Sequence, residues 1–95
     1  MAYSYTKKRK VSLGNRVGYI YALTEVATSG SKLFTPFKKI TGYIIETTSP
    51  QTNFINVLYN IEKGQITGGQ NNRGAYLQFA CAATSNGEIL VWGLL

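Results

Sequence analysis

The feature that most constrains this fold is a two-residue alternation of apolar and small or polar side chains. From Arg16 onward the alternation is regular and typical of a β-strand. One face of this strand carries Val17, Tyr19, Tyr21 and Leu23, and the other carries Gly18, Ile20, Ala22 and Thr24. No window of useful length has apolar residues at i, i+3, i+4 and i+7, so we expect little or no helix.

Turn residues divide the rest of the chain into further short strands. A polar loop at Ala27–Lys32 and a bend at Thr35-Pro36 precede a second expected strand, Lys39–Thr48. A third is expected at Asn53–Ile61. The triplet Glu62–Gly64 after it has the form of a hairpin turn that returns the chain into residues 65–67, and residues 68–74 form a glycine-rich loop.

The clearest local signal is Asn86-Gly87, which predicts a type I′ turn between two apolar strands. If Ser85 pairs with Glu88, every large side chain of the hairpin shares one face. The expected pairs on that face are Ala83 with Leu90, Cys81 with Trp92, and Phe79 with Leu94.

Five to seven short strands joined by Gly, Pro, Asn and Ser turns predict an all-β fold. We expect a small antiparallel β-sandwich, jelly-roll-like, with a small β-barrel as the alternative. Residues 16–95 are expected to form a single β domain. Residues 1–15 are expected to form an extended basic arm that adds nothing to the core.

The charge of the chain is low in amount and uneven in position. Only 15% of residues are charged while 44% are hydrophobic, so much uncharged surface is available for partner chains. The formal net charge is +6, and half of the positive side chains lie in the arm or just after it. The arm is predicted to bind a polyanion or another subunit; a solvated tail and a nuclear import signal are the alternatives. Its partner-binding residues are Tyr3, Tyr5, Lys7, Lys8, Arg9, Lys10 and Arg16.

Residue content argues against chemistry. The chain has no histidine and only four scattered glutamates, so the usual catalytic triads and zinc sites are not expected. The single cysteine, Cys81, lies in an apolar run and is expected to be buried and inert. We predict no enzyme, no cofactor, no metal and no small-molecule substrate. No apolar stretch approaches the ~20 residues of a membrane span, and no signal peptide is visible.

Several segments together resemble the small all-β virion proteins of tailed bacteriophages, of the head decoration or cement type. They are the short basic start, the loop Thr28–Ser31 leading to Thr35–Ile40, the segment Tyr59–Ile66, and Ala82–Val91. The resemblance implies a non-enzymatic structural protein of the virion, assembled in the host cytoplasm. It would bind the major capsid protein or other virion subunits, as a homo-oligomer or bound to the lattice.

A nucleic-acid-binding β module is the competing function. In that interpretation the basic arm grips phosphates while Tyr19 and Tyr21, on one strand face near Arg16, stack on bases. Partial burial of these tyrosines in the sheet is the alternative. A small viral inhibitor of a host protein is a third possibility that no residue favours.

Overall fold

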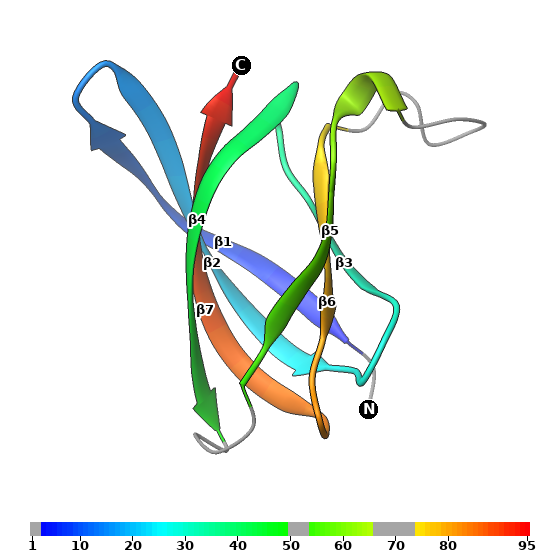
Figure 1. Cartoon of the computed structure of the whole chain (residues 1–95). Coiled ribbons are helices and arrows are strands. Elements are labelled where there is room, and N and C mark those ends of the chain that lie inside the picture. The colour runs from blue at the N-terminus through cyan, green and yellow to red at the C-terminus, as the bar shows by residue number, and fades with distance from the viewer. Residues whose placement is uncertain (1–2, 50–53, 66–73) are drawn as a thin grey trace.

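The chain folds into two packed antiparallel sheets. A computed structural model describes residues 3–49, 54–65 and 74–95. The four-stranded sheet has the order β1 (Ser4–Leu13), β2 (Arg16–Val26), β7 (Ser85–Leu94) and β4 (Lys39–Ser49). The three-stranded sheet has the order β3 (Ser31–Phe34), β6 (Tyr76–Ala80) and β5 (Asn56–Ile61). A 3-10 turn, η1 (Lys63–Gln65), is the one helical element among these residues. Figure 1 shows the two layers.

This arrangement confirms the predicted all-β sandwich. The strand pairs that the structure describes are all antiparallel. No pair within the described ranges joins one sheet to the other, so the barrel alternative is not formed there. The strands expected near Lys39–Thr48 and Asn53–Ile61 are present as β4 and β5, although residue 53 lies outside the described ranges.

The core lies between the sheets; β2, β3, β4, β6 and β7 contribute buried residues to it, while β1 and β5 contribute only partly buried side chains. Alternate residues of β2, β6 and β7 point into it, as the two-residue period requires. Its buried members are Tyr21, Leu23, Val26, Leu33, Phe37, Ile40, Ile55, Ala75, Leu77, Phe79, Cys81, Ile89 and Val91. Tyr21 and Leu23 thus face inward, on the face of β2 that also carries Val17 and Tyr19.

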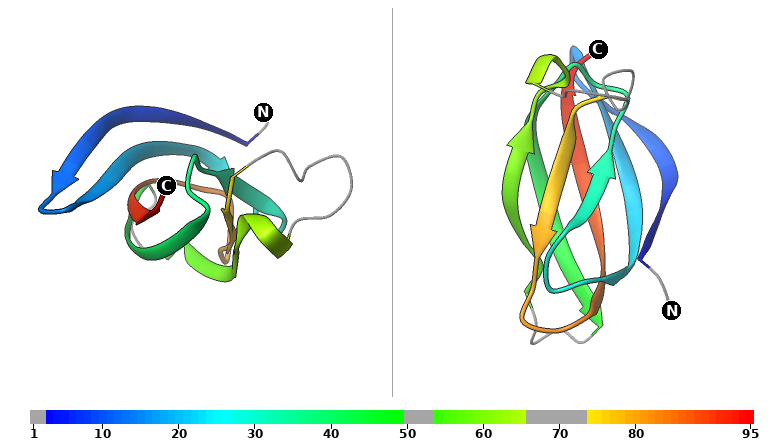
Figure 2. Two further views of the ribbon diagram at one scale, coloured as in Figure 1. Left: turned by 90° about the horizontal axis from the view of Figure 1, so that it is seen from above. Right: turned by 90° about the vertical axis from the view of Figure 1, so that its right-hand side faces the viewer.

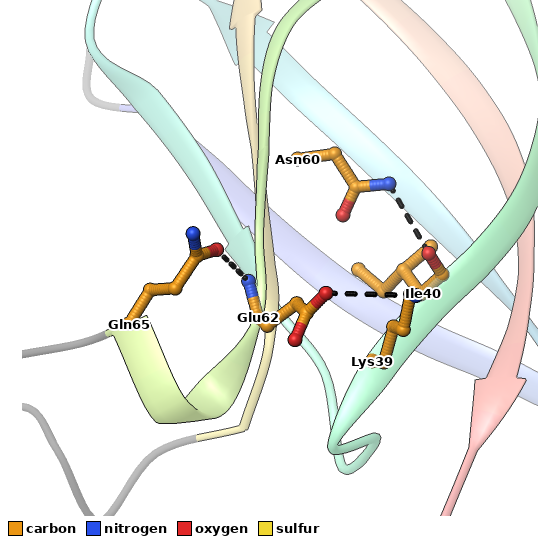
Figure 3. Close-up of polar contacts among 5 residues, drawn as sticks. All are labelled: Lys39, Ile40, Asn60, Glu62 and Gln65. Carbon is orange, nitrogen blue, oxygen red and sulfur yellow. Dashed lines mark hydrogen bonds and ion pairs between the residues drawn. The ribbon is translucent and has the colours of Figure 1, made fainter.

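Polar contacts tie the two sheets together where β4 begins and β5 ends (Figure 3). The Asn60 side-chain amide donates to the Ile40 carbonyl at 3.1 Å. Lys39 lies 3.6 Å from the Glu62 carboxylate, and the Gln65 side-chain oxygen accepts a hydrogen bond from the Glu62 backbone N–H. These contacts fix the neighbouring edges of the two layers.

The predicted basic arm is corrected by the structure, because residues 4–13 form β1. This strand pairs with β2 from Ser4↔Thr24 to Leu13↔Arg16, and the expected arm boundary falls at the tight turn between them. A β-bulge between Lys7 and Arg9 shifts its register. β1 is therefore an edge strand of the sheet, and Figure 2 shows the turn end of its hairpin projecting away from the three-stranded sheet.

The predicted Asn86-Gly87 hairpin is wrong. Both residues lie within β7, and β6 pairs with β3 and β5 in the opposite sheet. The chain crosses between layers at residues 81–84, so the expected pairs of Phe79, Cys81 and Ala83 with β7 do not form. Gly87 is needed for close approach: a Cβ there would lie 2.6 Å from the Glu46 carbonyl oxygen. The Asn86 side chain accepts a hydrogen bond from the Glu25 N–H.

Two smaller expectations also change. Ser31 and Lys32, assigned to a loop, begin β3, which pairs with β6. Gln65 lies in η1 and does not begin a returning strand. The strand that pairs with β5 is β6, which begins only at Tyr76. The rest of the expected return and most of the glycine-rich loop, residues 66–73, lie outside the described residues.

Candidate protein interface

The four-stranded sheet carries a second apolar surface, on the side turned away from the core. In β7, Ile89 and Val91 are buried in the core, so Leu90 and Trp92 point outward. Strand registers extend this side across all four strands. We call it the outer apolar face; its members are Val11, Leu13, Gly18, Ile20, Gly42, Ile44, Leu90, Trp92 and Leu94.

An aliphatic row crosses the middle of the outer apolar face. Ile20 on β2 pairs with Leu90 on β7, and Leu90 pairs with Ile44 on β4. Directly paired residues on one side of a sheet bring their side chains into contact distance. Ile44, at the edge strand, is 63% exposed. The row is thus continuous across three strands and open to solvent at its β4 end.

Trp92 forms the next part of the surface. It pairs with Gly42, and a Cβ on Gly42 would lie 2.2 Å from Cζ2 of the indole ring. The ring therefore lies flat against the glycine backbone of β4. Trp92 also pairs with Gly18 on β2, its other neighbouring strand. A Cβ on Gly18 would lie 3.0 Å from Leu13 Cδ1 and 3.1 Å from Leu90 Cδ1. Small residues in the sheet thus let large ones cover it closely.

Charged residues border this face next to the row of Ile20, Leu90 and Ile44, on the side away from Trp92. The Lys8 ammonium lies 2.9 Å from the Glu88 carboxylate, and Glu88 pairs across the strands with Glu46. Like charges directly opposite one another are unfavourable. Neither Glu46 nor Arg9 forms an ion pair within the described parts of the chain.

The two predicted aromatic anchors point into the protein's own fold. The Tyr3 hydroxyl donates to the Lys32 carbonyl at 2.8 Å, and burial, followed by the nearby Tyr5, raises its pKa. The Tyr5 ring lies 6.0 Å from the Tyr21 ring in an edge-on arrangement. These side chains attach β1 to the core, which corrects their assignment to a neighbouring subunit.

The five predicted basic residues do not share one surface. Lys7 points to the inner side, with its ammonium 4.8 Å from the centre of the Tyr19 ring. Lys8 reaches outward to Glu88, and the bulge lets Arg9 follow on the same side. Arg16 donates to the Thr41 hydroxyl at 3.1 Å. Lys10 and Arg9 are exposed, so the run presents cations on both sides of an edge strand.

The predicted stacking face is not available at Tyr21. This side chain is only 4% exposed, and its burial, with Tyr19 and Tyr5 nearby, raises its pKa to about 12. Tyr19 is half-buried, with its ring 5.5 Å from Phe37. The structure thus favours partial burial within the sheet for this tyrosine pair.

The opposite layer carries a different outer surface. Phe34 on β3 pairs with Tyr76 on β6, with ring centres 5.0 Å apart. The Lys32 ammonium lies 5.2 Å from the Tyr76 ring centre. An aromatic pair with a lysine over it is a self-contained cross-strand cluster.

Sequence reasoning missed the outward residues Ile20, Ile44, Leu90 and Trp92 as functional candidates. A signal was present, because Ile89–Trp92 is a continuous apolar run and a strand with one solvated face alternates instead. The predicted hairpin placed Leu90 and Trp92 on one face and Val91 on the other, and it did not predict that two apolar surfaces lie on opposite sides of one sheet.

The described residues offer no other candidate centre. No group of three His, Cys, Asp or Glu side chains within them is placed to hold a metal ion. Cys81 is buried, as predicted, with its thiol 3.3 Å from the Val26 carbonyl and 3.2 Å from that of Ala27. None of the described segments is a helix with the length and apolar content that crossing a membrane requires.

Comparisons with protein-family models, with curated proteins and with solved structures found no match to the chain.

Proposed function

We propose that this protein is a non-enzymatic structural protein that works by binding other protein subunits through the outer apolar face. The observation that carries the proposal is the row Ile20, Leu90 and Ile44 with Trp92 beside it, on the sheet side that no other described strand covers. Extended apolar patches on a protein surface mark interaction sites. An apolar centre bordered by Lys8, Glu88 and other charges matches the usual plan of protein interfaces.

The more specific role we propose is that of a decoration or cement protein on the head of a tailed bacteriophage. Its support is the resemblance of the basic start, the loops and the final segment to such proteins, together with the low charged fraction of 15%. In this role the protein binds the major capsid protein in the virion. Each contact buries apolar area, and the part of that gain that exceeds the entropy cost of association stabilises the lattice.

Particle association tests this function. The chain, detected with an antibody, is expected to band with virus particles in a density gradient of a culture that makes it. Leu90→Glu places a charge in the centre of the outer apolar face and should release the protein into the soluble fraction. Leu58→Glu, on exposed β5 in the other sheet, is the matched control and should stay with the particles. A wild-type protein found only in the soluble fraction refutes the capsid role.

A second candidate function, nucleic-acid binding, is favoured by β1. Four consecutive cationic residues, Lys7–Lys10, lie on this edge strand and are exposed. Cations aligned along one strand would bind phosphates without sequence preference, at an affinity that falls steeply with salt.

Titration of a labelled single-stranded oligonucleotide at two salt concentrations separates the two functions. Tight, strongly salt-dependent binding that is lost in an Arg9→Ala, Lys10→Ala double variant supports nucleic-acid binding. Weak binding that the double variant leaves unchanged supports the protein-binding role.

A further inference from the structure

We propose that the outer apolar face binds a second copy of this chain, across a twofold axis that runs parallel to the strands. The inference rests on the proposed function, because it takes the subunit that the outer apolar face binds to be another copy of this chain, which leaves contact with a capsid to other surfaces of the dimer. We infer the identity of the partner from the charges at the two edges of the four-stranded sheet. Residues of β1 and β4, the two edge strands, carry that charge.

The two edges of this sheet have opposite charge on the outer side. At the β1 edge, Arg9 lies in the row of Ile20, Leu90 and Ile44. At the β4 edge, Glu46 lies one outward position beyond Ile44, in the row of Glu88. The apolar centre is therefore bordered by a cation on one side and a carboxylate on the other.

Among the residues that the structure describes, neither of these charges has a counter-ion. The ion pairs formed there are Lys8 with Glu88 and Lys39 with Glu62, and they include neither Arg9 nor Glu46. Glu46 also faces Glu88 across the strands, where like charges oppose one another. A cation supplied from outside would relieve this repulsion, and such an interfacial pair fixes orientation more than it adds affinity.

Symmetry decides how a second copy supplies that cation. Two copies of one face can meet about an axis parallel to the strands or perpendicular to them. The parallel axis reverses the strand order, so that β1 of one copy lies over β4 of the other and Arg9 comes within one row of Glu46. The perpendicular axis lays β1 over β1 and sets Lys8 and Arg9 against the same cations. Charge therefore selects the parallel axis.

The apolar side chains suit the same arrangement. With the axis between β2 and β7, Ile20 of one copy lies over Leu90 of the other, and the contact repeats on the far side of the axis. Sheets stack at about 10 Å with interdigitating side chains. Two Arg9–Glu46 pairs would then close the two edges of one dry aliphatic centre.

The test is the mass of the purified chain in solution, measured by light scattering and sedimentation equilibrium over a concentration series. The wild type should approach twice the monomer mass of 10.5 kDa. Leu90→Glu should be monomeric while its circular dichroism shows an intact sheet. Leu58→Glu, outside the face, should associate as the wild type does.

Charge reversal tests the axis itself. Arg9→Glu and Glu46→Arg should each weaken the dimer about tenfold or more, and the double variant should recover most of that loss, because the pair is restored in reverse. A dimer whose double variant is no tighter than the single variants overturns the proposed axis and with it the inference.

The outcome also separates this inference from the proposed function. A wild type that stays monomeric to roughly 1 mM overturns the second copy as partner. If Leu90→Glu is nevertheless lost from particles, the face binds a different protein and the proposed function stands. If the wild type is monomeric and Leu90→Glu stays with the particles, both proposals fail.

Discussion

The outer surfaces of the two sheets differ in how the chain covers their apolar side chains. On the three-stranded sheet, Phe34 and Tyr76 pack ring against ring and Lys32 lies over Tyr76, so this aromatic cluster is covered by the chain itself, whereas Leu58 and Tyr59 on β5 are exposed. On the four-stranded sheet, Leu90 and Ile44 have no such cover and Ile44 is 63% exposed. The contrast teaches that neither aromatic content nor single exposed side chains mark an interface; a row of apolar side chains that continues across several strands without internal cover does.

The largest effect on this contrast is expected from Gly42→Val. The new side chain would occupy the place of the Trp92 ring, whose Cζ2 atom lies 2.2 Å from the Cβ position. We expect the free energy of unfolding to fall by about 1–3 kcal/mol, and the tryptophan emission to shift to longer wavelength as the ring becomes more hydrated. Gly64→Ala is the control, because a Cβ there meets nothing within 4 Å. An unchanged emission spectrum would mean that the ring does not lie on Gly42.

The attachment of β1 is expected to weaken at alkaline pH. Burial raises the pKa of Tyr21 to about 12 from 10.0, so the unfolded chain loses this proton first. Stability should be flat below pH 10 and should fall above it, with Tyr21 contributing up to about 1.4 kcal/mol per pH unit until its folded pKa is reached and Tyr3, whose pKa is also raised, adding to the slope. Urea unfolding at several pH values measures this slope. Tyr21→Phe should reduce it while Tyr3 maintains the rest, and an identical slope in that variant would exclude Tyr21 as a contributor.

The cover on the three-stranded sheet is tested by Lys32→Ala. Loss of the cation over Tyr76 should cost about 0.5–1 kcal/mol of stability. It should also increase binding of a hydrophobic dye, because the aromatic pair becomes exposed. Lys38→Ala, at an exposed residue of the connection before β4, should leave dye binding unchanged. Equal dye binding by both variants would remove the distinction between the two outer surfaces.

The smallest effect is expected from Lys8→Ala. Its ion pair with Glu88 is about half-exposed at both ends, and such pairs contribute less than about 0.5 kcal/mol. Thermal unfolding at low and high salt should differ little between this variant and the wild type. A large loss would show that Lys8 organises the charged border of the outer apolar face.

The sequence predicted the parts of the fold that local patterns determine. Val17 to Leu23 alternate cleanly, and β2 forms there with Tyr21 and Leu23 inward. The basic run concealed the strand pattern of β1. An edge strand that the other sheet does not cover can carry a lysine on its inner side, as β1 does at Lys7. The alternating Tyr3 and Tyr5 were the available sign of a strand.

The Asn86-Gly87 error had a tertiary cause. The pair is suited to a turn, but Gly87 is required by the approach of Glu46 and Ile55, and Asn86 bonds the N–H of Glu25, which has a positive φ of 55°. No local pattern encodes those neighbours. For the same reason the run Ile89–Trp92 could indicate two apolar sides but not which of them enters the core, because that depends on the other sheet.

The position of β7 bears on how the protein forms during synthesis. It lies between β2 and β4, yet it is the last of the seven described strands to leave the ribosome. Until then β2 and β4 present unpaired backbone edges, and long-range strand pairing of this kind is slow. A nascent or truncated product that ends before Ser85 would expose two strand edges that can pair with other chains. Capture by a chaperone or rapid translation of β7 would therefore be advantageous.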